Sequence, residues 1–312
     1  LTVPFSCIDP HFEGWGDPTG YQPVYEYHGE CDLVLIKNDL LDLDLHIRTG
    51  DADPSSTRST IQQVSLVKEA VLRIGTQTLE IKGGNVFLNT LQQIAPNPMA
   101  FASFLVYRTN SILRVEIGAG QYIRFDIYGS HQIQITIYGC DDFANSRGFL
   151  GTFCDEPQLD FLGRDWKTNY TSDLFIGNGS GWTYFPQSHV HEWAVDPIGR
   201  GDPSLFSTPA PANQDCLIRR RRLQAASATS GRPSDADIAN AEVVCAASIK
   251  VPEYLNSCVF DVAVTGDDRW RFNPVYNEEL LEDGAVVPLL TPAELDIFLS
   301  IGGDPGAARN DQ

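Results

Sequence analysis

Three successive segments with alternating apolar residues constrain the fold of this chain more than any other feature. Their apolar positions are Leu113/Val115/Ile117, Ile123/Phe125/Ile127 and Ile133/Ile135/Ile137. Residues two apart lie on the same face of a β-strand, so each segment predicts a strand with one face on a core. Glycine-containing turns, and no helical crossover, separate the segments. The pattern therefore predicts an antiparallel sandwich rather than an α/β sheet.

The same period of two occurs earlier in the chain. Leu43, Leu45 and Ile47 alternate with a polar set that consists of Asp42, Asp44, His46 and Arg48. This alternation predicts a half-buried strand with its polar side chains on the opposite face. Further strands are expected at 70–74, 78–81, 86–88 and 104–107, with Gly83-Gly84 as a hairpin turn.

Composition excludes several classes of protein. The 312 residues are 42% hydrophobic, as in a globular protein, and they contain no run of 18 apolar residues, so we expect no transmembrane segment. The 41 acidic and 22 basic residues give a formal charge of −19. That charge repels phosphate backbones, so nucleic acid is not expected as a partner.

Seven cysteines stand at positions 7, 31, 140, 154, 216, 245 and 258, with no Cys-x-x-Cys pair. This spacing favours disulfides over a structural zinc site. The glycosylation sequons at Asn169 and Asn178 lie in polar, loop-like sequence. Disulfides and N-glycans together predict an extracellular or cell-surface protein.

The composition changes after Pro203. Residues 204–212 are rich in Pro, Ser and Ala, Arg219-Arg220-Arg221-Arg222 is a basic run, and 225–233 is small and polar. We interpret 1–205 as a β-sandwich domain, 206–233 as a linker and 234–312 as a small helical region. The arginine run has three interpretations: a solvated linker, a processing site, or a contact for an anionic glycan.

The last part of the chain has helical periodicity. Ser234-Asp235-Ala236-Asp237 is a cap for a helix that contains Ile238, Ala241, Val244 and Cys245. A second helix is expected from Pro252 to Cys258, and a disulfide between Cys245 and Cys258 would join the two helices.

Several motifs together resemble the von Willebrand factor type D domain, which is a secreted β-sandwich. The matching residues are Cys7, Asp9-Pro10-His11-Phe12, Gly29-Glu30-Cys31, Gly151, Phe153, Asp160-Phe161 and the closing Glu192-Trp193-Ala194-Val195. The resemblance spans roughly residues 3 to 205. Ile8 departs from it, because the family has glycine there.

The resemblance implies two disulfides in the sandwich domain. Leu150 occupies the position of a family cysteine, so Cys7 is expected to pair with Cys154, four residues later, or with the competing Cys140. Cys31 is expected to pair with Cys216. Because seven is odd, at least one thiol, for which Cys140 is the candidate, is left free or pairs with another chain.

The resemblance also implies a calcium site. Its candidate ligands here are Asp17, Glu156 and Asp160, while Thr152, Cys154 and Leu159 replace oxygen donors of the family pattern. Calcium requires six to eight oxygen ligands, so a solvated acidic loop is the alternative and no other cofactor is expected.

The sequence predicts a non-enzymatic module that makes protein contacts in a matrix, filament or cell-surface layer, as a homo- or hetero-assembly. No hydrolase or phosphate-binding motif occurs. His189 and His191 are interpreted as ordinary residues of a strand. Two alternatives remain: a calcium-dependent or glycan-binding module, with Trp166, Trp182 and Tyr184 as aromatic candidates, and a secreted hydrolase.

Overall fold

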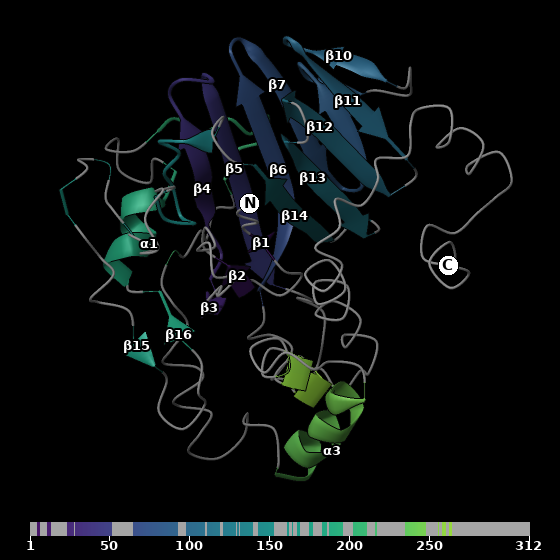
Figure 1. Cartoon of the computed structure of the whole chain (residues 1–312), viewed down its shortest axis with the longest axis vertical. Helices are drawn as coiled ribbons and strands as arrows, with labels where there is room; N and C mark the ends of the chain where they lie inside the picture. Colours follow the sequence, from purple (N-terminus) through teal and green to yellow (C-terminus); the bar gives the residue numbers. More distant parts are fainter. Residues whose placement is uncertain are drawn as a thin grey trace, which may run out of the picture.

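The protein is described here by a computed structural model. It describes residues 5–6, 11–13, 24–27, 29–51, 65–92, 98–109, 111–118, 121–128, 130, 132–139, 143–152, 161, 164, 167–168, 175–176, 183–185, 187–195, 202–210, 216, 235–247, 255, 258–259 and 262–263. Within these ranges the fold is mainly β, as the sequence predicts, with two sheets and short helices (Figure 1).

The larger sheet has ten strands. Their spatial order is β10 (Met99–Phe101), β11 (Phe104–Arg108), β12 (Ile112–Gly118), β13 (Gln121–Tyr128), β14 (Gln132–Tyr138), β1 (Phe5–Ser6), β2 (His11–Glu13), β3 (Val24–Glu26), β16 (Thr183–Tyr184) and β15 (Phe175–Ile176). All neighbours are antiparallel except β3 and β16, which are parallel. The meander predicted from the three alternating segments is confirmed as β12, β13 and β14.

The second sheet is a meander of six antiparallel strands. In chain order they are β4 (Asp32–Asn38), β5 (Leu43–Asp51), β6 (Ser65–Ile74), β7 (Gln77–Lys82), β8 (Asn85–Leu88) and β9 (Leu91–Gln92). The predicted Gly83-Gly84 turn joins β7 to β8, and both glycines have positive φ. Positive φ is cheap for glycine, which has no Cβ, so this pair permits a tight hairpin.

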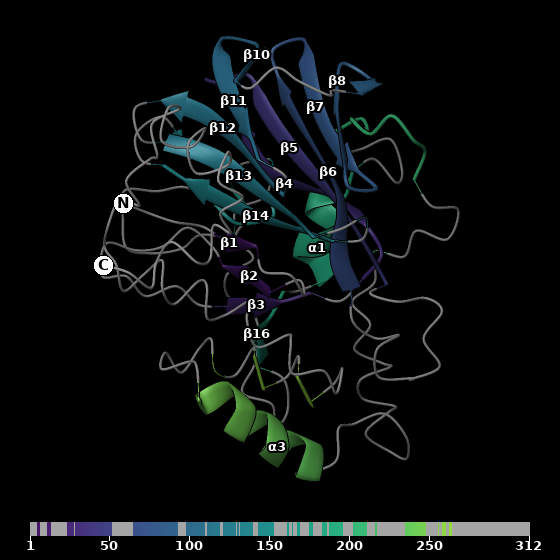
Figure 2. The same cartoon turned by 90° about the vertical axis from the view of Figure 1, so that its right-hand side faces the viewer.

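The two sheets enclose one hydrophobic core. Leu43, Leu45 and Ile47 point into it from β5, and the predicted apolar faces of β12, β13 and β14 point into it from the other sheet. The polar residues of β5 therefore lie on the outer face of the six-stranded sheet. Figure 2 shows the two sheets from a direction in which β10 to β14 and β4 to β8 are separated.

Two segments from later in the chain cover the free edge of β4. The backbone N–H of Phe149 donates to the Val34 carbonyl oxygen at 2.9 Å, and that of Val195 donates to the Asp32 carbonyl oxygen at 2.8 Å. At Gly148 a Cβ atom would lie 2.3 Å from the Leu35 carbonyl oxygen, so this close approach requires glycine. Both segments thereby fix the position of β4.

The strand expected around His189 and His191 is wrong, because residues Gln187–Trp193 form the helix α1. Its buried side chains are His189, Val190 and Trp193, which share one face of a helix. His191 is exposed on the other side. Of the residues in the Trp-Ala-Val motif, Trp193 is the last residue of the helix, and Ala194 forms an isolated β-bridge with Leu33.

A second, smaller apolar cluster belongs to the helical region. Helix α3 (Asp235–Ala246) contributes Ala241 and Cys245, and Cys258 is joined to Cys245 by a disulfide, the pairing expected from the sequence. Ser234 and the tail from residue 264 lie outside the described residues. Among the helices that the structure describes, none has the length and apolar content needed to cross a membrane.

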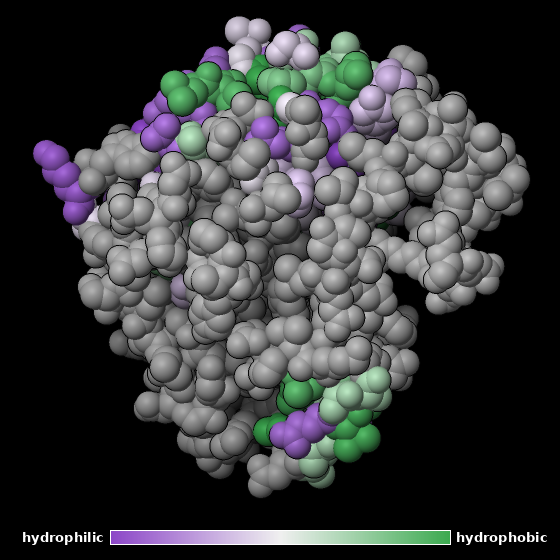
Figure 3. Space-filling model, viewed as in Figure 1, coloured by the Kyte–Doolittle hydropathy of each residue, from purple (hydrophilic) through white to green (hydrophobic). Residues whose placement is uncertain are grey.

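Four turns meet at one end of the sandwich. Gly75 donates to the Asp42 carbonyl oxygen at 3.0 Å, Asn89 to that of Thr78 at 2.8 Å, and Ala102 to the Gln77 side chain at 2.9 Å. Exposed apolar side chains at or beside these turns include Leu40, Leu91 and Leu105. Figure 3 shows hydrophobic residues gathered at the top, where the ends of β7, β10 and β11 lie in Figure 1.

Candidate functional site

The largest concentration of buried charge in the described chain lies on the outer face of the six-stranded sheet. It is covered by residues 202–210, which we call the closing segment. This segment contacts β4 through Asp202, β5 through Thr208 and β7 through Ser207. Figure 2 shows it in green, on the side of β7 and β8 that faces away from the other sheet. Residues 206–210 were assigned to the linker by composition, yet they are bound to the sandwich.

Arg48 of β5 is the centre of this site. Its Nε and Nη2 donate to the two carboxylate oxygens of Asp32 at 2.7 and 2.9 Å. Nη1 donates to Glu69 Oε2 at 2.8 Å and to Thr208 Oγ1 at 2.9 Å, and Nη2 also donates to the Thr208 carbonyl oxygen at 3.2 Å. These bonds use all the N–H donors of a guanidinium group. The Phe206 ring lies 4.3 Å from the Arg48 guanidinium carbon.

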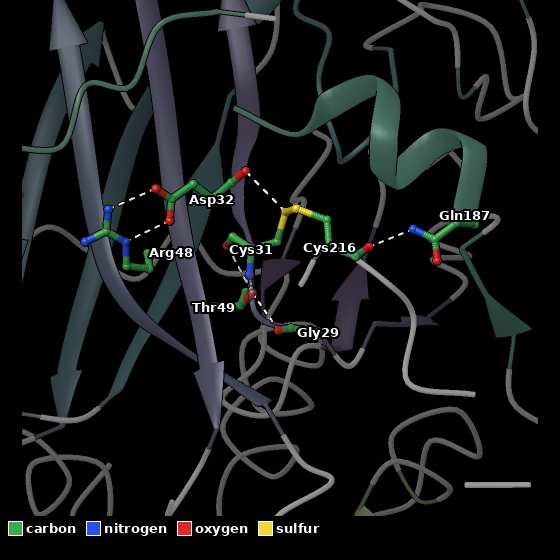
Figure 4. The surroundings of a disulfide bond; sticks show 7 residues. All are labelled: Gly29, Cys31, Asp32, Arg48, Thr49, Gln187 and Cys216. Atoms are coloured by element: carbon green, nitrogen blue, oxygen red, sulfur yellow. Dashed lines mark hydrogen bonds and ion pairs between the residues drawn. A yellow bond between two sulfur atoms is a disulfide. The ribbon is translucent and has the colours of Figure 1, made fainter. Parts of the chain in front are cut away.

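A disulfide joins the start of β4 to the chain beyond the closing segment. It links Cys31 to Cys216, the pairing that the family resemblance implies. The Thr49 hydroxyl accepts from the Cys31 N–H at 3.0 Å and donates to the Gly29 carbonyl oxygen at 2.8 Å. Gln187 Nε2, at the start of α1, donates to the Cys216 carbonyl oxygen at 2.7 Å (Figure 4). The disulfide and these hydrogen bonds therefore join β4, β5 and α1 to Cys216, six residues beyond the closing segment.

A second charged cluster holds the beginning of the closing segment. Lys37 of β4 donates to Asp202 at 2.9 Å and lies 3.5 Å from Asp44 of β5, while Arg164 forms a short ion pair with Asp202. Burial alone would raise the pKa of Asp202, but the hydrogen bonds from Lys37 and Arg164 lower it below its usual value. Arg164 also lies over the Trp193 ring, 4.8 Å from its centroid. Asp202 is thus fixed as a carboxylate between two cations.

Two histidines are fully buried near these clusters. His46 lies on the outer face of β5 between Asp44 and Arg48, and neither of its ring nitrogens has a hydrogen-bond partner within the described ranges. His189 of α1 packs against Phe185, and its Nε2 lies 3.0 Å from the Phe149 carbonyl oxygen. Burial lowers the pKa of each histidine to about 4, despite the carboxylates near His46 and the hydrogen bond of His189.

Acidification from pH 7 to pH 5 should lower the free energy of unfolding by about 2 kcal/mol per histidine. Both rings stay neutral in the folded protein down to about pH 4, whereas they become protonated from about pH 6.5 in the unfolded chain. Stability is therefore complete above pH 6.5 and is lost as the pH falls toward 4. Urea unfolding at several pH values measures how the free energy of unfolding changes with pH.

His46→Leu is the matched variant for this measurement. Leucine lacks the titrating nitrogens and suits a position opposite Val71, which is buried on the neighbouring strand. We expect this variant to lose roughly half of the acid dependence and to keep its stability at pH 7.5 within about 1 kcal/mol, because the ring nitrogens that are removed have no described partner. If the pH dependence of the free energy of unfolding is the same in His46→Leu and in the wild type, His46 is not a source of the acid sensitivity.

The described side chains of this site attach residues 202–210 to the six-stranded sheet. The guanidinium of Arg48 and the carboxylates of Asp32 and Asp202 are engaged with other side chains of the same chain. In the part of the chain that the structure describes, no three His, Cys, Asp or Glu side chains are grouped so that they would hold a metal ion. The chemistry that this arrangement supplies is ionic and covalent attachment of one segment to a sheet.

Many residues singled out from the sequence lie outside the described residues or have undescribed side chains. They are Cys7, Cys140, Cys154, Asp17, Glu156, Asp160, Asn169, Asn178, Arg219, Arg220, Arg221, Arg222, Trp166, Trp182 and the side chain of Tyr184. The calcium site, the third disulfide, the glycans and the processing site thus stay predictions. Sequence reasoning placed Arg48 on the polar face of its strand but did not identify its partners.

The chain matches no protein-family model, and a search of curated proteins found no significant match.

Proposed function

We propose that this protein is an extracellular, non-enzymatic assembly module of the von Willebrand factor type D kind, which links to other protein chains through disulfides and surface contacts. The observation that supports this proposal is the odd number of cysteines in the chain. Two described disulfides use Cys31, Cys216, Cys245 and Cys258, and three of the seven cysteines remain. An odd number leaves at least one sulfur that no partner within the chain satisfies.

The described site supports this proposal in a second way. Arg48 and Asp202 form ion pairs that hold chain segments together, and a disulfide joins Cys216, beyond the closing segment, to Cys31, which precedes β4. Such a structure suits a protein whose task is to keep its shape while other chains are attached to it. Its charge of −19 favours soluble protein partners over anionic surfaces.

Native material should migrate as multiples of the 34.4 kDa chain without reductant and as the monomer with reductant. Non-reducing and reducing gel electrophoresis of thiol-blocked samples measures this. Cys140→Ser is the informative variant, because Cys140 is the predicted interchain thiol, and its covalent oligomer should disappear. A wild-type chain that remains monomeric under oxidising conditions at high concentration would exclude covalent assembly.

A further inference from the structure

His46 lies on the outer face of the six-stranded sheet, where a polar side chain would ordinarily reach water, yet it is fully buried. Neither of its ring nitrogens has a hydrogen-bond partner within the described ranges. Its neighbours across β4 and β6 are Val34 and Val71, whose side chains offer no hydrogen-bond acceptor. A second proton on the ring would therefore have no described acceptor and no access to water.

The closing segment passes over this ring. One end is fixed beside Asp44, because the ammonium group of a β4 lysine lies 2.9 Å from Asp202 and 3.5 Å from Asp44. Further along the segment, Phe206 lies over the guanidinium of Arg48. Asp44 and Arg48 flank the histidine on the outer face of β5 and are separated by about 13 Å along the strand. Since the extended chain from 202 to 206 reaches at most about 14 Å, residues 203–205 follow a nearly direct path across the histidine.

The described contacts of the closing segment lie outside the core. Phe206 is buried, but it belongs to neither hydrophobic cluster and packs against Arg48. The ion pairs and hydrogen bonds of Asp202, Ser207 and Thr208 all go to charged side chains outside the core. Lifting the segment from the sheet would therefore bring water to the histidine and leave the apolar interior between the two sheets closed.

Charged side chains surround His46 on each described element around it. They are Asp44 and Arg48 of β5, Asp32 and Lys37 of β4, Glu69 and Arg73 of β6, Glu80 of β7, Arg164, and Asp202 of the closing segment. Burial lowers the pKa of His46 to about 4 and outweighs the attraction of two carboxylates, while two nearby cations act in the same direction as burial. Contact with water would therefore raise this pKa toward its ordinary value of about 6.5.

We propose that the closing segment is released by acid: protonation of His46 detaches residues 202–208 from the outer face of the six-stranded sheet, while the core and the Cys31–Cys216 bond stay intact. This inference goes beyond the proposed assembly function and does not depend on it. The closed form is favoured above pH 6.5 and is lost as the pH falls toward 4, because only the open form binds the proton in this range. Between pH 7.5 and pH 5 the equilibrium constant for opening should rise about 30-fold.

Hydrogen–deuterium exchange of the full-length chain tests this proposal. Opening is measured as the protection of the Ser207 amide, whose N–H donates to Glu80 at 3.0 Å, after correction for the intrinsic effect of pH on exchange. We expect this protection to fall about 30-fold from pH 7.5 to pH 5. The Val195 amide, which donates to the Asp32 carbonyl oxygen at the edge of β4, is the internal control and should keep its protection. Unchanged protection of Ser207 would overturn the proposal, and so would an equal loss at Ser207 and Val195, which indicates wider unfolding.

Two variants identify the group that binds the proton. His46→Leu should lose the acid response, so that the protection of Ser207 at pH 5 stays within about threefold of its value at pH 7.5. His189→Leu is the matched control, because His189 is equally buried but makes no described contact with the closing segment, and the response of about 30-fold should remain. If the response persists in His46→Leu, the proposal is rejected, and Glu69, whose pKa is raised by burial, becomes the group to examine. The wild-type comparison of Ser207 with Val195 decides the matter by itself if His46→Leu does not fold.

Discussion

Replacing Cys31 and Cys216 together with alanine should lower the free energy of unfolding of the sandwich by about 5 kcal/mol on the chain-entropy model. The two cysteines are separated by 185 residues, so the bond restricts most of the unfolded chain. It also holds the Cys216 carbonyl against Gln187 and the start of β4 against Thr49. Denaturant unfolding followed by far-ultraviolet circular dichroism measures the change in midpoint.

The matched control is the Cys245→Ala/Cys258→Ala variant. Its bond closes a loop of 13 residues, for which the same model gives about 3 kcal/mol. That loss should be confined to the helical region, because these cysteines belong to a cluster separate from the core between the sheets. The β-sheet signal should then unfold at the wild-type midpoint. Equal effects of both variants on this signal would contradict the assignment of Cys31–Cys216 as the bond that stabilises the sandwich.

The sheet structure was predictable where one face of a strand is buried and the other is polar. In β12, β13 and β14 the core side chains occupy every second position, so the sequence period reveals the strands directly. The same holds for β5. The predicted strand limits were less accurate. The strand predicted at 70–74 begins at Ser65 in the structure, and the prediction missed its first residues because Lys68 and Glu69 interrupt the apolar run.

The helix α1 was missed for a physical reason. His189 and His191 alternate with Val190 and Glu192, which imitates the period of a strand. The buried set, however, is His189, Val190 and Trp193, and the spacing of four from His189 to Trp193 is the helical signal that was available. A histidine that is buried like a hydrophobic residue hides this signal, because histidine is ordinarily counted as polar.

The candidate site was not predictable, because its members come from distant parts of the chain. Arg48 lies 16 residues from Asp32, 21 from Glu69 and 160 from Thr208, so no local spacing reveals their association. The composition of residues 204–212 predicts no regular secondary structure, and the described part, residues 204–210, contains no helix or strand. It carries no information on whether such a segment is packed against a sheet.

Arg48→Met should lower the free energy of unfolding by about 3–5 kcal/mol, because it leaves a buried charge without its partner. The Asp32 side chain is 2% exposed and receives two hydrogen bonds from Arg48, and Glu69 loses its described cation. Thr208 loses two donors as well, so the closing segment should become more sensitive to proteases. Urea unfolding and limited proteolysis of the same variant measure the two effects.

Two further variants separate the buried charge from the other effects of this substitution. Arg73→Met, on β6, removes a cation that pairs with Asp42 and Asp44 but makes no described contact with the closing segment, and its side chain is 25% exposed. For Arg73→Met we expect a smaller loss of stability and unchanged proteolysis of the closing segment.

Adding Asp32→Leu to Arg48→Met should recover much of the lost stability, since the uncompensated carboxylate is then gone. Recovered stability with persistent proteolysis of the segment would show that Arg48 acts in two separable ways, stabilising the sheet through Asp32 and holding the closing segment through Thr208 and Phe206. If the double variant is no more stable than Arg48→Met, the buried charge is not the source of the loss.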